Sequence, residues 1–224
     1  MNPTPFRFTA LAACLAIATT AGCARLPAAA ATASDAGTPT PAAPVAADND
    51  AGLARASAAA MAFSSQLRSE LLAAMAAGGP VAAVDVCHTR APRIAGMVMT
   101  EHGVQLGRVA LPGRNRNPAQ AADDWRLATL QVFQQAVDAG APAAEQVSVV
   151  RDGLPDGVAL RMMRGIATEP ACLACHGSEV AGPVRAAIAK RYPGDQATGF
   201  AVGDLRGALW VEVPTPAAPG PAAP

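Results

Sequence analysis

The segment Cys-Leu-Ala-Cys-His at residues 172–176 constrains this chain more than any other feature. Two thiols separated by two residues can form thioethers with the two vinyl groups of one porphyrin, and a histidine directly after the second thiol then lies at the iron. The pattern therefore predicts covalent attachment of one haem c through Cys172 and Cys175, with His176 as the proximal iron ligand.

A Cys-x-x-Cys pair also occurs in zinc sites and in thiol redox proteins. A structural zinc site needs four ligands, and this sequence has no second Cys pair and no His pair to supply the other two. A redox pair belongs in a thioredoxin-like context, which the flanking sequence lacks. Both alternatives are weaker than haem attachment.

Residues 1–22 have the character of a signal peptide, with Arg7 in the n-region and an apolar run too short to span a bilayer. The run ends in Thr-Ala-Gly-Cys at residues 20–23, which is similar to a bacterial lipobox except that threonine stands where leucine is usual. We expect export to the periplasm and lipidation of Cys23, which would tether the protein to the membrane. Ordinary cleavage nearby, which would release a soluble protein, is the alternative.

Composition separates one expected domain from its flanks. Residues 23–50 and 214–224 consist mainly of alanine, proline and small polar residues. Such segments cannot bury enough apolar surface to offset the entropy of ordering, so we expect a disordered tether and a disordered tail. The remaining residues, 51–213, have the length of a single domain.

The charge balance argues against one class of partner. The chain carries 17 basic and 17 acidic residues, and the basic residues form no stripe. Nucleic acid is therefore not an expected partner. The expected partner is instead an unidentified periplasmic redox protein or sensor protein.

Cys87 is the cysteine that neither the leader nor the haem motif explains. The chain has five cysteines; Cys14 and Cys23 fall in the leader, and two belong to the motif. Cys87 therefore has no internal disulfide partner. It falls on an apolar helical face, where it is either a small buried core residue or a functional side chain that faces a pocket.

The periodicity of apolar residues predicts helices first and short strands later, which is typical of an α+β domain. Small cytochromes c, in contrast, are nearly all helical. A first helix over residues 53–77 ends at Gly-Gly-Pro, and a second over 80–103 is expected to break or kink at Pro92, soon after Cys87. The other expected elements are a strand over 104–111, a loop over 112–120, a helix over 123–139, a hairpin of 147–150 with 158–164, a helix over 181–191, and strands over 200–202 and 208–213 around a turn at 203–207.

Arg114 and Arg116 lie in the predicted loop. A guanidinium group matches the geometry of a carboxylate, so either side chain can contact a haem propionate. A solvated loop with no such contact is an equal alternative.

Four segments stand out together: Val-Cys-His-Thr-Arg-Ala-Pro-Arg-Ile-Ala at 86–95; Gly-Arg at 107–108 with Arg-Asn-Pro at 116–118; Ala-Cys-Leu-Ala-Cys-His-Gly at 171–177; and Arg-Tyr-Pro-Gly-Asp-Gln-Ala at 191–197 with Gly-Asp-Leu-Arg-Gly at 203–207. In this order they resemble a family of bacterial haem c domains formerly of unknown function. The resemblance covers nearly all of the expected domain. It departs from the usual loop pattern at Gln120, where asparagine is usual, and at Ala122, where proline is usual.

This resemblance implies a PAS-like fold, with an antiparallel sheet, flanking helices and N-terminal helices before the sheet. It also implies that iron is held by the motif histidine and by a cysteine of the early helix, which by position are His176 and Cys87. Related domains occur as sensor parts of membrane histidine kinases.

The residues alone leave the sixth iron ligand open. Cys87, His88, His102 and water are all candidates, and the resemblance favours Cys87. A methionine is the usual partner in electron carriers. The candidate methionines are Met61, Met75, Met97, Met99, Met162 and Met163.

Three functions follow from these expectations. The first is electron transfer or redox sensing, because two protein ligands leave no open iron position and so disfavour catalysis. The second is a sensor of NO or CO, in which Cys87 leaves the iron when the gas binds. The third is a peroxidase, which needs an open distal site with acid–base groups. We expect the first, and hence a protein that is not an enzyme.

Overall fold

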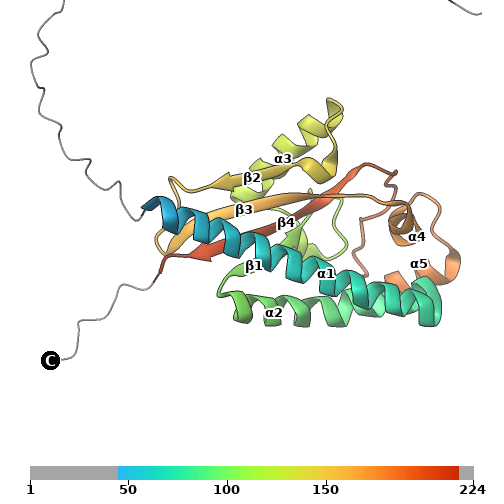
Figure 1. The fold of residues 1–224 in the computed structure, drawn as a ribbon. Helices are drawn as coiled ribbons and strands as arrows, with labels where there is room; N and C mark the ends of the chain where they lie inside the picture. Colours follow the sequence, from blue (N-terminus) through green and yellow to red (C-terminus); the bar gives the residue numbers. More distant parts are fainter. Residues whose placement is uncertain (1–44, 217–224) are drawn as a thin grey trace, which may run out of the picture. The chain divides into compact units, whose positions relative to one another are not determined.

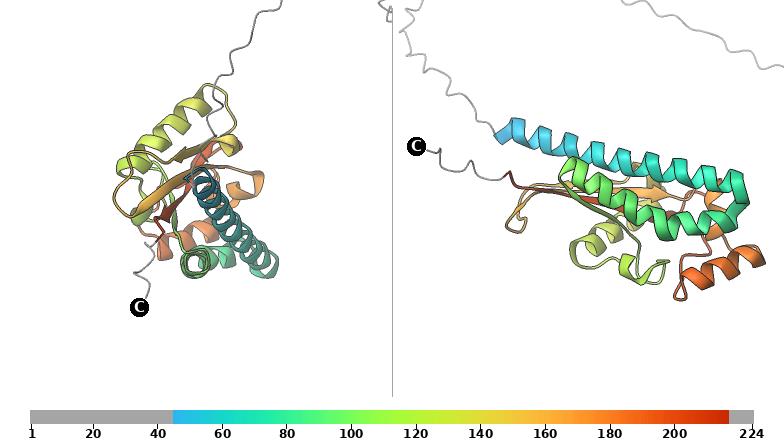
Figure 2. Two further views of the ribbon diagram at one scale, coloured as in Figure 1. Left: turned by 60° about the vertical axis from the view of Figure 1, so that its left-hand side comes forward. Right: turned by 90° about the horizontal axis from the view of Figure 1, so that it is seen from below.

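The computed structural model describes residues 45–216. The predicted signal peptide, the predicted lipidation site Cys23 and the end of the tail from residue 217 lie outside the described residues. Within them, a four-stranded antiparallel sheet in the order β1-β4-β3-β2 carries helices on both faces (Figures 1 and 2). The α+β prediction is confirmed.

The long helix α1 (Val45–Asp85) covers one face of the sheet. Its helical dihedral angles are interrupted at Gly78 and Gly79, where the sequence predicts the first helix to end. Residues 45–50 are helical, whereas the sequence predicts a disordered tether there; alanine-rich sequence favours helix once a packed helix follows.

The helical stretch Ala51–His102 is long and apolar enough, by length and composition alone, to cross a membrane. Much of this apolar character comes from alanine, and the buried residues Ala56, Phe63 and Leu67 pack against the sheet. Length and composition are therefore weak evidence for a membrane span here.

A π-helical turn, η1 (Val86–Arg90), joins α1 to α2 (Ala91–His102). The Ala91 N–H donates to the Val86 carbonyl, five residues back, and Pro92 lies in the first turn of α2. The sequence predicts a break or kink at Pro92, and this is wrong: the chain stays helical through a π turn. Pro92 has no N–H, and in a regular α-helix its ring would clash with the carbonyl four residues earlier. The wider π turn accommodates the ring, so the helix continues.

Two hydrophobic cores lie on opposite faces of the sheet. In the order of the sheet they are β1 (Gln105–Val109), β4 (Leu205–Pro214), β3 (Val158–Ala167) and β2 (Val147–Val150). Val211 and Val213 of β4 pack toward α1 and α2, while α3 (Asp124–Asp138) covers the other face with Leu130 and Phe133.

The predicted strand over residues 200–202 is absent, and β4 begins at Leu205, inside the predicted turn. The Phe200 N–H donates to the His176 carbonyl and the Gly203 N–H to the Thr168 carbonyl. The backbone N–H groups of Phe200 and Gly203 therefore donate to carbonyls at residues 168 and 176 and not to a neighbouring strand. The remaining elements are short: η2 (Pro118–Gln120), η3 (Ala143–Glu145), η4 (Pro170–Cys172), α4 (Leu173–His176) and α5 (Gly182–Arg191).

Candidate functional site

The Cys-Leu-Ala-Cys-His segment forms a short helical turn after β3. Pro170 occupies the first position of η4, and the Cys172 N–H donates to the Glu169 carbonyl. Residues three apart in a helical turn lie on one side, so the thiols of Cys172 and Cys175 share a side. Both are free, half-buried thiols, which leaves them accessible to a reaction partner.

One ring nitrogen of His176 is unprotonated. Its Nδ1 lies 2.7 Å from the Ala197 carbonyl oxygen, which can only accept, so Nδ1 carries the proton and Nε2 keeps its lone pair. Burial lowers the pKa of His176 to about 2, and the nearby Arg206 and Arg116 guanidinium groups add to this effect. The imidazole is therefore neutral at physiological pH and able to bind a metal through Nε2.

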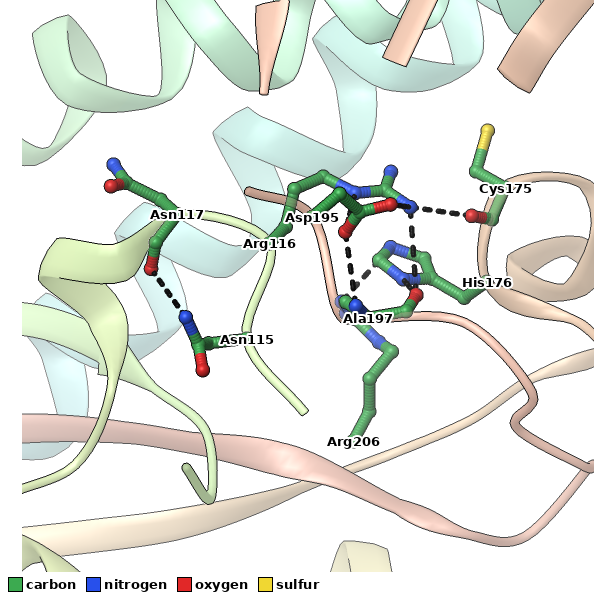
Figure 3. A network of polar contacts seen from close by, with 8 residues as sticks. All are labelled: Asn115, Arg116, Asn117, Cys175, His176, Asp195, Ala197 and Arg206. Atoms are coloured by element: carbon green, nitrogen blue, oxygen red, sulfur yellow. Dashed lines mark hydrogen bonds and ion pairs between the residues drawn. The ribbon is translucent and has the colours of Figure 1, made fainter. Parts of the chain in front are cut away.

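A buried ion pair between Arg116 and Asp195 joins the segments that contain His176 and its hydrogen-bond partner Ala197 (Figure 3). The Arg116 Nε donates to Asp195 Oδ1 over 3.0 Å, and the two side chains are only 9% and 11% exposed. Arg116 Nη2 also donates to the carbonyl oxygens of Cys175 and Ala197. One guanidinium thus joins the loop after β1, the motif and the segment that contains Ala197.

Arg114, the other arginine that the sequence singles out, lies against the aromatic neighbour of the histidine. Its guanidinium carbon is 3.8 Å from the centroid of the Phe200 ring, and Nη2 is 3.8 Å from Asp204 Oδ2. Phe200 in turn meets the His176 ring edge-on, with centroids 6.2 Å apart. Both predicted loop arginines thus belong to the site, but both already have acidic partners.

Cys87 lies in η1, on the helical segment that packs against the motif. Val84, three residues earlier and hence on the same side of the helix, is clustered with Cys175 and with α5. Burial raises the pKa of the Cys175 thiol, Arg116 opposes this, and the charge of Cys87 adds to the rise. The contact of Val84 therefore places the helical segment that carries Cys87 beside Cys175.

Two further contacts tie η1 and the end of α1 to α5, the helix that follows the motif. Asp85 pairs with Arg191 at 2.7 Å, and the His88 ring meets Tyr192 edge-on with centroids 5.3 Å apart. His88 is exposed on the protein surface. Residues on either side of Cys87 therefore contact the C-terminal end of α5.

The other candidate sixth ligands have different surroundings. Met162 and Met163 fill the cores on opposite faces of β3, and Met61 and Met97 are mostly exposed. Met75 and Met99 are half-buried on α1 and α2, and His102 ends α2. In the described part of the chain, no three His, Cys, Asp or Glu side chains form a cluster that could hold a metal ion.

Two residues near the histidine, Arg206 and Arg108, were not predicted from the sequence as site residues. Arg206 Nη1 lies 3.5 Å from His176 Nε2, the unprotonated nitrogen of the imidazole. Burial lowers the pKa of Arg206 to about 9, and the neighbouring Arg108 contributes to this. Both arginines fall in the segments 107–108 and 203–207 that support the family resemblance, but no local pattern marks their role.

These features define a class of protein: a small α+β domain with one neutral imidazole, two thiols at thioether spacing and a third thiol on the facing helix. The donor set fits a haem attached by two thioethers, with one or two axial protein ligands. The orphaned Arg206 Nε, which is buried without a hydrogen-bond partner beside the imidazole, is a further sign that a polar group is accommodated here.

The profile of the Tll0287-like family matches residues 41–214, so the chain belongs to this family. Among solved structures, the crystal structure of the cyanobacterial heme-protein Tll0287 is similar at 31% sequence identity, over 60% of this chain and 74% of that chain, with a TM-score of 0.46. Comparison with curated proteins gave no match. The family resemblance inferred from the sequence is confirmed.

Proposed function

We propose that this protein binds one haem c, attached to Cys172 and Cys175, with His176 and Cys87 as the axial ligands of iron. The observation that carries the proposal is the neutral His176 imidazole, whose Nε2 keeps its lone pair because Nδ1 donates to Ala197. Membership of the Tll0287-like family and the similarity to a heme-protein support haem binding.

Electron transfer or redox sensing is the role that this ligand set favours. A bound haem supplies a one-electron redox couple, and the protein sets its potential through the axial ligands and the surrounding charges. Two protein ligands leave no iron position for a substrate, so the proposal is a redox protein and not an enzyme. A thiolate from Cys87 stabilises the ferric state and lowers the potential.

We also propose a place and a partner for this activity. The leader and the sequence Thr-Ala-Gly-Cys at residues 20–23 support export to the periplasm and lipidation of Cys23. A periplasmic redox protein or sensor protein is then the partner that receives or reports the electron.

Sensing of NO or CO is a second candidate because Cys87 lies in a π-helical turn. Such turns are an irregular form of the helix and are frequent at functional sites, which is consistent with a Cys87 ligand that leaves the iron when the gas binds. Binding of CO by the reduced protein, with loss of the cysteine ligand, favours this candidate over simple electron transfer.

The test is covalent haem attachment together with reversible redox chemistry. After denaturation and acid–acetone extraction, wild-type protein is expected to keep its haem colour, and the double variant Cys172→Ala/Cys175→Ala is expected to lose it. Spectroelectrochemistry of the intact wild type is then expected to show one reversible one-electron couple. Haem that extracts freely from the wild type contradicts the covalent proposal, and protein that acquires no haem at all contradicts the function.

A further inference from the structure

A β-bulge in β4 determines where the Arg206 side chain points. In the pairing of β3 with β4, Ile166 lies opposite Gly207 but Ala167 lies opposite Leu205, so Arg206 is the extra residue. Gly207 has φ 143°, and a Cβ there would overlap the Val109 carbonyl oxygen on β1. Glycine is therefore required at this bulge.

The bulge turns Arg206 to the face of the sheet that carries α1 and α2. Leu205 and Ala208 both pack into the core beneath α3, although they are three residues apart and would otherwise lie on opposite faces. Leu209 packs into the opposite core, with α1 and α2. Arg206 consequently shares the side of Leu209, and Figure 3 shows its side chain reaching from the strand to the imidazole of His176.

Arg108 reaches the same place from the neighbouring strand. It lies directly opposite Leu209 in the β1–β4 pairing, and side chains of directly opposed residues lie on the same face. Burial lowers the pKa of Arg108, and burial together with the charge of Arg108 lowers that of Arg206. The two side chains therefore extend from neighbouring strands on the same face of the sheet.

These two cations differ from the other arginines of the site in having no acidic partner. Arg116 pairs with Asp195, Arg114 with Asp204, and exposed Arg68 with Glu169. Among residues 45–216, no carboxylate lies within ion-pair distance of Arg108 or Arg206. Two half-buried cations side by side are unfavourable unless an anion joins them.

We infer that Arg108 and Arg206 form an anion subsite for the propionate carboxylates of the haem, an inference that rests on the proposed function. A guanidinium fork matches a carboxylate in shape and charge, and no second anion source is needed because the haem brings its own. Iron ligation at His176 Nε2 requires the Arg206 Nη1, 3.5 Å away, to turn aside, and a propionate gives it a partner when it does. This assigns to Arg108 and Arg206 the role that the sequence suggests for Arg114 and Arg116.

The inference has a measurable consequence for the redox couple. A paired guanidinium keeps a propionate ionised, so the midpoint potential of the wild type is nearly independent of pH around neutrality. Without the arginine, the carboxylate titrates at higher pH and does so differently in the two oxidation states. The potential then acquires a pH-dependent slope, and it shifts to more negative values where the propionate is ionised.

The experiment compares haem-loaded full-length wild type with Arg206→Gln, Arg108→Gln and Arg206→Lys. The matched control is Arg164→Gln, an exposed arginine on β3 of the same sheet. Potentials are measured by spectroelectrochemistry from about pH 5 to about pH 9, and the propionate bending bands are recorded by resonance Raman spectroscopy. Both glutamine variants are expected to show a new pH slope and shifted propionate bands, Arg206→Lys a smaller change of each, and Arg164→Gln neither.

Potentials and propionate bands that match the wild type in haem-loaded Arg206→Gln and Arg108→Gln overturn the anion subsite and leave the proposed function intact. A wild type that binds no haem contradicts the proposed function itself. If one glutamine variant fails to accumulate, the other decides: wild-type bands and a wild-type pH profile in that variant overturn the subsite as well.

Discussion

The Nδ1 of His176 lies 2.7 Å from the Ala197 carbonyl oxygen, and this contact decides which nitrogen of the imidazole is free. Ala197 is held in turn by its N–H, which donates to Asp195, and by Arg116, which also reaches Cys175. The orientation of the histidine therefore depends on a buried ion pair outside the Cys-x-x-Cys-His motif.

Asp195→Asn removes the charge that compensates Arg116. An unpaired buried charge is unfavourable, so the free energy of unfolding is expected to fall by about 3 kcal/mol or more. Denaturant unfolding followed by circular dichroism measures this. The control is Glu70→Gln, which breaks the exposed pair with Arg90 and is expected to cost about 1 kcal/mol or less. Equal losses in the two variants would show that burial of the Arg116 pair does not matter.

Gly207→Ala tests the bulge in β4. A Cβ at this φ angle and against the Val109 carbonyl oxygen is strained, so we expect a loss of stability of more than about 1 kcal/mol. Gly96→Ala on α2 is the matched control, since a Cβ there meets nothing within 4 Å, and it is expected to stabilise by up to about 1 kcal/mol. Thermal unfolding of both variants measures the difference, and a neutral Gly207→Ala would contradict the assigned geometry.

The pair of Arg68 with Glu169 predicts a pH dependence at the start of the motif. The hydrogen bond from Arg68 lowers the pKa of Glu169 from its ordinary value of 4.5. A carboxylate with a lowered folded-state pKa stabilises the fold above its unfolded-state pKa, and this contribution is lost as the pH falls through the lowered value. Glu169→Gln is therefore expected to be slightly less stable than the wild type near neutral pH and equally stable in acid.

Unfolding measured at several pH values tests this dependence. Glu101→Gln, at an exposed position on α2, is the control. It is expected to track the wild type at every pH. A difference between Glu169→Gln and the wild type that persists in acid would contradict the assignment.

Lipidation of Cys23 predicts a change of compartment. The wild type is expected in the membrane fraction of a bacterial host, and Cys23→Ser is expected in the soluble periplasmic fraction, because the acyl chains are attached through the thiol. Cell fractionation with immunoblotting measures both. A wild type recovered wholly in the soluble periplasm would support ordinary signal cleavage instead.

Local patterns in the sequence were sufficient for most of the fold. Apolar periodicity predicts helices over 53–77 and 123–139, and turn residues predict the hairpin. These patterns depend on residues close together in the sequence, and the corresponding elements α1, α3, β2 and β3 are present in the structure. The order of elements then indicates the α+β class. The family resemblance, carried by four separate segments, is confirmed.

The remaining features depend on neighbours that are distant in sequence. Pro92 excludes a regular α-helical hydrogen bond, but a break, a kink and a π turn all satisfy that constraint, and only packing selects one. Phe200 lies in a strand-like pattern, yet its N–H donates to His176. The absence of an acidic partner for Arg108 and Arg206 within the described residues depends on strand register and on a bulge.

The sixth iron ligand is the prediction that decides the mechanism. Cys87 lies in the π turn of η1, its neighbour Val84 packs with Cys175, and it is half-buried as a free thiol. Iron binds such a residue as a thiolate, which donates charge to ferric iron. The potential is then expected near the low end of the range of about 0.8 V that axial ligands span. If Cys87 held the iron, reduction would weaken that bond, and the redox state would then reach the helix after Cys87.

Ferric wild type is expected to show the low-spin electron paramagnetic resonance signal of a thiolate-ligated haem. Cys87→Ala is expected to convert it to high spin or to the signal of a new ligand, while haem stays attached through Cys172 and Cys175. Met99→Ala is the control, because Met99 is a half-buried methionine on α2 and its loss is expected to leave the signal unchanged. An unchanged spectrum in Cys87→Ala, with haem still bound, would exclude Cys87. A change in Met99→Ala would instead identify a methionine ligand and a higher potential.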